Sequence, residues 1–432
     1  MKIKRMASHG LRATSDEKMC QITRKAREAA LELAVTPTEK KNKALFAMAR
    51  GIDAAREDIK KANLKDIANA EKNGKSRAFI DRLRLDDRRI DGMCAMMKEV
   101  AALDDPVGKV MESVKRPNGL LIKKVRVPIG VIGVIYESRP NVTADCVALC
   151  LKAGNSVILR GGSDAIVSNK AIYACIKKAA SREGLHEGTF ILIEDTSRAL
   201  VDAMLKAVGG VDLIMPRGGE SLIEEVVKKS RIPVIKHYKG ICHVYVDGSA
   251  DLRMAEEICF NAKVQRPGVC NAMETMLVHE KVAAVFLPII GKKFIDAGVT
   301  LKGCPRTRVI LKGEKVKAAT NVDYATEYLD LVLNVRVVRS LNEAIEHITR
   351  FGSAHSDAIV TDNKDNADEF TKRVDSAAVY VNASTRFTDG GEFGKGAEIG
   401  ISTDKLHARG PMGLEELTSY KYVVHGNGQI RA

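Results

Sequence analysis

The sequence predicts an α/β protein with two parallel-sheet units and a small β hairpin. Short apolar runs alternate with amphipathic segments from Gly130 to Tyr238, and a similar alternation continues from Cys242 to Asn382. A strong turn signal, Asn118-Gly119, separates two strand-like runs. Strands that alternate with helices favour parallel sheets, because parallel neighbours need a crossover connection that is usually a helix.

Residues 15–103 come first and predict helices, because apolar side chains recur at spacings of three and four with charged residues between them. Residues 106–128 form the predicted hairpin, which cannot bury both of its faces alone. We therefore expect the hairpin to project and to pair with another segment, most simply in a partner subunit. The strand-like C-terminal run 418–430 is a second candidate for that pairing.

The first sheet is predicted to contain five strands with four helices between them, at residues 130–137, 156–160, 190–194, 211–216 and 233–238. Such a doubly wound sheet binds ligands at the carboxyl ends of its strands. The second unit has strand-like runs at residues 242–250, 274–280, 335–340, 356–362 and 377–382. The segment 383–417 is irregular and rich in glycine, and a loop of this length is usually functional.

Composition excludes several classes of protein. The chain has 432 residues, of which 45% are hydrophobic, and contains no apolar run long enough to predict a membrane span. The N-terminus lacks the apolar core of a secretory signal, although its basic start leaves a transit peptide open. Nine scattered cysteines, an odd number, favour free thiols in a reducing compartment, so we expect a cytoplasmic protein. Cys146 and Cys150 lie on one helical face, but further ligands are lacking nearby, and we predict no metal site.

The net charge of +14 invites the hypothesis of a basic nucleic-acid-binding protein. Three features oppose it: the basic residues are spread along the chain, tryptophan is absent, and aromatic residues make up only 4%. We expect a solvated basic surface that attracts anionic small molecules, and no nucleic-acid partner.

Two glycine pairs follow predicted strands and precede predicted helices. Glycine lets a backbone approach phosphate, and the N–H groups at a helix start favour an anion. The arginine beside each pair suits a phosphate, including a ribose 2′-phosphate. One pair alone is better explained by tight packing, whereas two in one sheet favour a dinucleotide. The residues are Arg160, Gly161, Gly162 and Ser163 in one turn, and Arg217, Gly218, Gly219, Glu220 and Ser221 in the other.

Cys270 has a setting unlike that of the other cysteines. It follows a Pro-Gly pair and one small apolar residue, and an apolar strand-like run comes next. A thiol at the mouth of such a turn is held rigidly and can still be reached, which suits a nucleophile. The alternative is a buried structural cysteine, the commoner role of a free thiol.

Together, six stretches resemble the aldehyde dehydrogenase superfamily over nearly the whole chain. They are PIGVIGVIYESRPNVT (Pro128–Thr143), LKAGNSVILRGGSDA (Leu151–Ala165), DLIMPRGGESL (Asp212–Leu222), QRPGVCNAMET (Gln265–Thr275), ATEYLDLVL (Ala325–Leu333) and GEFGKGAEIGISTDKLHARGPMGLEELTSYKY (Gly391–Tyr422). The resemblance implies the superfamily fold, with an NADP-binding domain at residues 1–105 and 128–236 and a catalytic domain at 237–405. It also implies an oligomerisation hairpin and tail at 106–127 and 406–432, and hence a homo-oligomer.

The resemblance also assigns roles to residues. Cys270 is the implied nucleophile, the Arg160 turn would bind the adenosine end of NADP, and the Arg217 turn would face its pyrophosphate. Glu327 would bind the nicotinamide ribose. Asn141 would polarise the substrate carbonyl, with Arg139 or backbone N–H groups as alternatives. The positive charge of four residues in the glycine-rich segment, and not the resemblance, suits an anionic substrate, and the alternative for each of them is a solvated surface charge: Arg386, Lys395, Lys405 and Arg409. Arg139 and His237 are further candidates for substrate binding.

One departure from the superfamily pattern bears on the reaction. Hydrolytic members carry a glutamate that activates water, whereas this chain has His237-Tyr238-Lys239-Gly240 at that place. The departure favours acyl-phosphate chemistry, because activated water would destroy a thioester. We expect reduction of L-glutamyl 5-phosphate to L-glutamate 5-semialdehyde with NADPH, as in proline biosynthesis, with glutamate 5-kinase as a candidate partner. The alternative is an acylating enzyme that uses coenzyme A.

Overall fold

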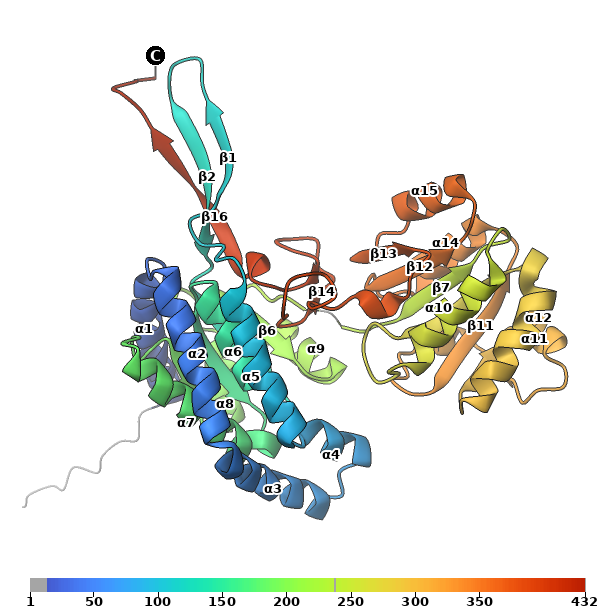
Figure 1. Ribbon diagram of the computed structural model, residues 1–432, viewed down its shortest axis with the longest axis horizontal. Helices are drawn as coiled ribbons and strands as arrows, with labels where there is room; N and C mark the ends of the chain where they lie inside the picture. The colour runs from blue at the N-terminus through green and yellow to red at the C-terminus, as the bar shows by residue number, and fades with distance from the viewer. Residues whose placement is uncertain (1–13, 237, 432) are drawn as a thin grey trace, which may run out of the picture. The chain divides into compact units, whose positions relative to one another are not determined.

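The computed structural model describes residues 14–236 and 238–431 (Figure 1). The chain divides into unit 1, which comprises Met1–Ile235 and Leu417–Ala432, and unit 2, which comprises Lys236–Glu416. The predicted hairpin 106–127 and residues 417–432 belong to unit 1. Residues 406–416, which were predicted with the C-terminal tail, belong to unit 2.

The N-terminal part of unit 1 is helical, as predicted. Thr14 and Glu17 form a capping box at the start of the first helix, with side chain and backbone bonded reciprocally. Apolar residues at three- and four-residue spacings are buried in these helices. The helices are α1 (Ser15–Leu33), α2 (Thr38–Ala54), α3 (Arg56–Lys72), α4 (Arg77–Leu83) and α5 (Asp87–Ala102).

The sheet of unit 1 is parallel, and its strand order is β5-β4-β3-β6. The strands are β3 (Val131–Tyr136), β4 (Ser156–Gly161), β5 (Phe190–Leu192) and β6 (Leu213–Arg217), and the helices that follow them are α6 (Val142–Lys152), α7 (Ile166–Arg182), α8 (Arg198–Leu205) and α9 (Glu220–Lys229). The chain first runs from β3 to β4 and β5, and then returns to the other side of β3. Right-handed crossovers therefore put α6 and α7 on one face and α8 on the other, and α1 and α8 share one apolar cluster.

The expected fifth strand, residues 233–238, is wrong. Pro233 accepts a hydrogen bond from the Ile214 N–H, Ile235 donates to the Ile214 carbonyl, and the chain makes only an isolated bridge with β6 at Val234. Pro233 has no N–H, which removes one possible hydrogen bond to a neighbouring strand.

A second sheet of unit 1 contains the predicted hairpin, β1 (Val110–Lys115) and β2 (Leu121–Pro128), together with β16 (Thr418–His425). The eight residues of β16 pair antiparallel with β2, which confirms that the C-terminal run pairs with the hairpin, here within one chain. These strands extend away from the rest of unit 1 (Figure 1). Apolar side chains stay exposed on both outer strands, at Val110, Met111, Tyr422 and Val424.

Unit 2 contains a parallel sheet in the order β10-β9-β11-β8-β7-β12-β13. Its strands are β7 (Cys242–Val246), β8 (Met273–His279), β9 (Thr300–Gly303), β10 (Lys317–Ala318), β11 (Val332–Val338), β12 (Ser356–Val360) and β13 (Ala378–Val381). Its helices are α10 (Leu252–Val264), α11 (Glu280–Asp296), α12 (Pro305–Ile310), α13 (Asn321–Tyr324), α14 (Leu341–Phe351) and α15 (Lys364–Arg373). The elements between residues 300 and 324 were not predicted.

The sheet of unit 2 is covered on both faces. Residues of α10, α11 and α12 pack in one apolar cluster, and residues of α14 and α15 pack in another. β8 is buried at each of its seven positions. Most of the segment 383–417 is irregular, as predicted, with the short pair β14 (Ile401–Ser402) and β15 (Gly410–Pro411).

Candidate functional site

In unit 1, both glycine turns flank the carboxyl end of β3. The Gly162 N–H donates to the Tyr136 carbonyl at 2.8 Å, and the Glu137 N–H donates to the Arg217 carbonyl at 3.0 Å. β4 and β6 are the two neighbours of β3: β4 and β5 are added on one side of β3, and β6 is added on the other. Such a switch point is where open α/β sheets bind ligands.

The turn after β6 packs tightly against Glu137. A Cβ at Gly218 would lie 2.5 Å from a carboxylate oxygen of Glu137, so any larger residue would require the Glu137 side chain to move. The Gly219 N–H donates to the same carboxylate at 3.2 Å. A Cβ at Gly219 would meet no atom within 4 Å, so the start of α9 is open on that side. An open helix start next to a glycine turn fits a phosphate group.

The turn after β4 differs from the prediction in one respect. Asp66 of α3 accepts hydrogen bonds from the Ser168 N–H at 2.7 Å and from the Val167 N–H at 3.3 Å. A protein carboxylate therefore already satisfies amides in the first turn of α7. Burial raises the pKa of Asp66, which the hydrogen bonds from Ser168 oppose. A phosphate at this turn would therefore be bound by the residues that precede α7.

Arg160 is the second-last residue of β4, and part of its guanidinium has no partner among the described residues. Its Nη2 donates to the Thr196 carbonyl at 2.6 Å, whereas its buried Nε has no hydrogen-bond partner among the described residues. Burial lowers the pKa of Arg160. A buried donor without a partner is costly and suits an incoming acceptor. The residues at both turns therefore fit the anionic end of a dinucleotide.

Asn141 lies just before α6 and donates from Nδ2 to Asp145 at 2.8 Å. Burial raises the pKa of Asp145 to about 7, and the Asn141 hydrogen bond and the charges of Arg217 and Arg139 oppose that rise. The predicted residues Arg139, Asn141 and Arg217 thus share one polar cluster in unit 1.

In unit 2, the predicted residues gather at the amino ends of neighbouring strands. Cys270 precedes β8, Gly240 precedes β7 and Glu327 precedes β11. These strands are adjacent in the order β11-β8-β7. Cys270 is partly exposed, whereas Cys94, Cys146, Cys150, Cys242 and Cys259 are buried. Cys175 and Cys304 are also partly exposed and Cys20 is exposed, so the exposure of Cys270 is compatible with a nucleophile without distinguishing it from these cysteines.

The backbone of the Cys270 loop is held from two sides. The Cys242 thiol donates to the Cys270 carbonyl at 3.2 Å. A Cβ at Gly240 would lie 1.9 Å from the Cys270 carbonyl oxygen and 2.5 Å from its Cα, so only glycine fits. The Gly240 N–H donates to Glu327 Oε1 at 2.9 Å, which brings the predicted Glu327 to the same edge.

A buried ion pair joins the two ends of the Cys270 loop. Lys263, at the end of α10, donates to Glu274 of β8 at 2.9 Å, and neither side chain is exposed. Glu274 also accepts a hydrogen bond from the Leu329 N–H at 3.2 Å, and Leu329 lies two residues after Glu327. Burial raises the pKa of Glu274 and lowers that of Lys263, and their mutual attraction opposes both shifts.

Arg386 is the predicted substrate-binding residue that lies against this loop. Its Nε donates to Gln265 Oε1 at 2.8 Å, and its Nη1 donates to Asn271 Oδ1. Asn271 in turn donates to the Thr388 carbonyl at 2.9 Å. Arg386 therefore connects the segment 385–388 to both ends of the turn that carries Cys270.

The remaining predicted basic residues form ion pairs within unit 2. Lys395 pairs with Glu416, and Arg409 pairs with Asp375 at 2.7 Å. Lys405 also pairs with Asp375. His237 lies outside the described residues.

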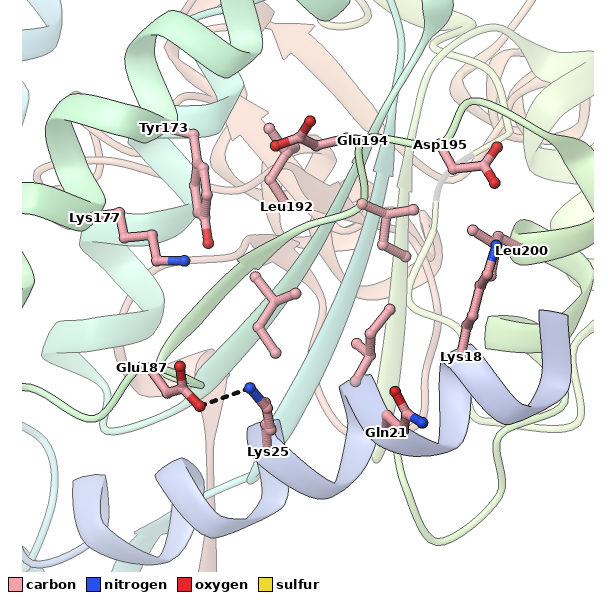
Figure 2. A pocket seen from close by; sticks show the side chains of 13 residues that line it. Lys18, Gln21, Lys25, Tyr173, Lys177, Glu187, Leu192, Glu194, Asp195 and Leu200 are labelled. Atoms are coloured by element: carbon pink, nitrogen blue, oxygen red, sulfur yellow. Dashed lines mark hydrogen bonds and ion pairs between the residues drawn. The ribbon is translucent and has the colours of Figure 1, made fainter. Parts of the chain in front are cut away.

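Unit 1 also contains a cavity of about 400 Å³ between α1, α7 and the edge strand β5 (Figure 2). Its rim includes the ion pair between Lys25 and Glu187, 2.7 Å apart. Tyr173 lines it and donates from its hydroxyl to the Phe190 carbonyl at 2.8 Å. The predicted site residues are not among those that line this cavity.

Neither a metal cluster nor a membrane helix is found in the part of the chain that the structure describes. Within it, His, Cys, Asp and Glu side chains do not form a group of three or more that could hold a metal ion. No described helix is long and apolar enough to cross a membrane.

Several contacts of the site were not predicted. Cys242, Asn271 and the Lys263–Glu274 pair resemble ordinary core or surface residues in the sequence, because their partners lie in other elements. Gly240 offered one signal, since it directly follows the place where the expected glutamate is missing.

Comparisons with known proteins agree with these observations. The model of the aldehyde dehydrogenase family matches residues 7–300. A gamma-glutamyl phosphate reductase of Thermodesulfovibrio yellowstonii is 59% identical over 94% of this chain and 97% of that protein. One of Caldanaerobacter subterraneus is 58% identical over 94% of this chain and 98% of that protein.

Solved structures show the same fold. The crystal structure of gamma-glutamyl phosphate reductase from Thermotoga maritima aligns with a TM-score of 0.93 and 48% identity, and the alignment covers 96% of this chain and all (100%) of that chain. An acetylating aldehyde dehydrogenase from Geobacillus thermoglucosidasius has a TM-score of 0.67 at 16% identity, covering 97% of this chain and 98% of that chain, a likeness of fold alone.

Proposed function

The chain belongs to the aldehyde dehydrogenase family and, within it, to the gamma-glutamyl phosphate reductases, and on this premise we propose its reaction. It reduces L-glutamyl 5-phosphate to L-glutamate 5-semialdehyde and phosphate with NADPH, in proline biosynthesis. The observation that carries the proposal at the site is the partly exposed Cys270 in a loop held by Gly240 and Cys242.

Cys270 acts as the nucleophile. Its thiolate attacks the acyl carbon of the substrate, the bond from that carbon to the phosphate oxygen breaks, and phosphate leaves. The acyl group remains on Cys270 as a thioester. When bound, NADPH supplies the hydride that reduces the thioester carbonyl; cleavage of the carbon–sulfur bond then releases the aldehyde and restores the thiolate.

Backbone donors support the oxyanion that forms at the acyl carbon. The N–H groups of Cys270 and Asn271 have no hydrogen-bond partner within residues 14–236 and 238–431. Preorganised backbone donors of this kind stabilise developing negative charge. We propose that the Asn141 side chain also donates a hydrogen bond to this oxyanion, with Arg139 as the alternative donor.

The segment before Gly240 explains why the thioester is not hydrolysed. Gly240 contacts the backbone of Cys270, and Tyr238 and Lys239 precede it where hydrolytic relatives carry their water-activating glutamate. Neither residue has a carboxylate. Glu327 accepts a hydrogen bond from the Gly240 N–H, and we assign its carboxylate to the nicotinamide ribose.

Unit 1 is the proposed NADP-binding domain and unit 2 the catalytic domain. Arg160–Ser163 and Arg217–Ser221 would hold the adenosine and pyrophosphate parts of NADP. The sheet of β1, β2 and β16 is the proposed oligomerisation surface, because its outer strands expose apolar side chains. We propose a cytoplasmic homo-oligomer that receives its labile substrate from a glutamate 5-kinase.

Replacing Cys270 by alanine tests the proposal. We expect turnover to fall by at least about 10³-fold while NADPH binding persists. Cys175→Ala is the matched control, because Cys175 is also partly exposed but lies in α7. The assay is phosphate-dependent NADPH formation from the cyclised semialdehyde. Activity that survives Cys270→Ala, or that requires coenzyme A instead of phosphate, would contradict the proposal.

A further inference from the structure

Two arginines lie at the Cys270 turn: Arg266 belongs to the turn, and Arg386 contacts it from the segment 385–388. The nearby carboxylates are engaged elsewhere: Glu274 binds Lys263, and Glu327 accepts the Gly240 N–H. Asp389 accepts the N–H of its own loop residue Gly391 at 2.9 Å. The positive charge at the Cys270 turn therefore comes from Arg266 and Arg386.

Arg386 is fixed and still has donors to offer. Its Nε and Nη1 bind Gln265 and Asn271, on the two sides of Cys270, which fixes the plane of the guanidinium. Its Nη2 has no hydrogen-bond partner among the described residues. A guanidinium in a fixed orientation with free N–H groups is well suited to phosphate oxygens.

Arg266 directly follows Gln265 and is exposed. In the part of the chain that the structure describes, its side chain makes neither a hydrogen bond nor an ion pair. Burial lowers the pKa of Arg386, and the charge of Arg266 acts in the same direction, whereas a thiolate at Cys270 and the Asp389 carboxylate act in the opposite one. Two guanidinium groups that repel each other beside a thiol gain from an anion that binds both.

Building on the function proposed above, we propose that Arg266 and Arg386 form the subsite for the leaving phosphate beside Cys270. Arg386 orients the phosphate through its fixed N–H groups, and Arg266 adds the second charge that a phosphate dianion needs. As the bond from the acyl carbon to oxygen breaks, negative charge increases on the phosphate, so both arginines stabilise the leaving group. The pair makes the site selective for an acyl phosphate.

Alkylation of Cys270 tests this subsite without any turnover. Iodoacetate is an anion and iodoacetamide is neutral, so the ratio of their rate constants at Cys270 measures the local positive potential. We expect Arg266→Gln to lower this ratio about five- to tenfold. Inorganic phosphate should slow alkylation of the wild-type protein by iodoacetate and lose that effect in Arg266→Gln.

Arg253→Gln is the control, because Arg253 is an exposed arginine at the opposite end of α10 and its loss changes the net charge equally. An unchanged ratio in Arg266→Gln, or an equal fall in Arg253→Gln, would overturn the proposal. Kinetics give a second measurement: Arg266→Gln should raise the KM for phosphate at least about tenfold in the semialdehyde-oxidising direction and leave the KM for NADP unchanged.

The two proposals fail differently. Wild-type protein without phosphate-dependent turnover would refute the proposed reaction, whereas the alkylation ratio would still decide whether the arginine pair binds phosphate. Normal turnover with an unchanged KM for phosphate in Arg266→Gln would refute only the subsite.

Discussion

Gly240→Ala is the substitution whose effect follows most directly from the structure. The new Cβ would lie 1.9 Å from the Cys270 carbonyl oxygen and 2.5 Å from its carbonyl carbon and Cα. All three are backbone atoms, so a side-chain rotation cannot relieve the contact. Either Gly240 or the Cys270 turn must move.

The size of that movement sets the expected loss. Raising the closest contact from 1.9 Å to the minimum of 3.0 Å that Cβ atoms tolerate requires a displacement of about 1.1 Å. A misplacement of about 1 Å at a reacting group can lower the rate about 10²-fold. Forcing extra volume into a packed region costs about 1–3 kcal/mol of unfolding free energy. We therefore expect a kcat/KM at least about 10²-fold lower and a moderate loss of stability.

Phosphate-dependent NADPH formation and urea unfolding measure the two effects. Gly92→Ala is the control, because Gly92 lies within α5 and a Cβ there meets nothing within 4 Å. Alanine at position 92 should stabilise the helix by about 0.5–1 kcal/mol and leave activity unchanged. A kcat/KM for Gly240→Ala within about threefold of the wild type would refute the argument that Gly240 positions the nucleophile.

Three further substitutions have defined outcomes in urea unfolding. Lys263→Met leaves Glu274 buried without its cation, so we expect a loss of about 3–5 kcal/mol. Burial raises the pKa of Glu274 from 4.5 to about 7, so the folded state binds the proton of this carboxyl more tightly than the unfolded state does. The stability lost in Lys263→Met should therefore be greater at about pH 8, where Glu274 is ionised, than at about pH 5. The reverse order would contradict this reasoning. Asp66→Ala removes the acceptor of two backbone amides at the start of α7, and it should lower the free energy of unfolding by about 1–3 kcal/mol. Unchanged stability would show that those amides find another acceptor. Tyr173→Phe removes a hydrogen bond to the edge strand β5, and it should lower the free energy of unfolding by about 0.5–1.5 kcal/mol without changing activity. A loss of activity would show that the cavity beside β5 contributes to function.

Local features of the sequence determined most of the fold. Spacings of three and four predicted that residues 15–103 are helical, although not the break between α2 and α3; Asn118-Gly119 located the turn between β1 and β2, and the alternation of elements predicted two parallel sheets. The apolar run that begins with Pro233 looks like a strand in the sequence, but among the described residues it makes only an isolated bridge with β6 at Val234.

For the site, the sequence singled out Cys270 and both glycine turns, because a nucleophile before a buried strand and a glycine pair before a helix are signals within a few residues. Which groups surround them depended on sheet order and on contacts between distant segments. The acceptor at the start of α7 comes from Asp66, about a hundred residues earlier in the chain. Arg386 reaches Gln265 across 121 positions.

The sequence by itself singled out the candidate nucleophile and the glycine turns, and it predicted the two parallel sheets. Only the tertiary structure decided that the site residues of unit 2 lie at the amino ends of β7, β8 and β11, and that Gly240 and Cys242 hold the Cys270 loop. The physical reason is that periodicity and turn preferences act between neighbours in the chain, whereas strand order brings together segments whose separation leaves no local pattern.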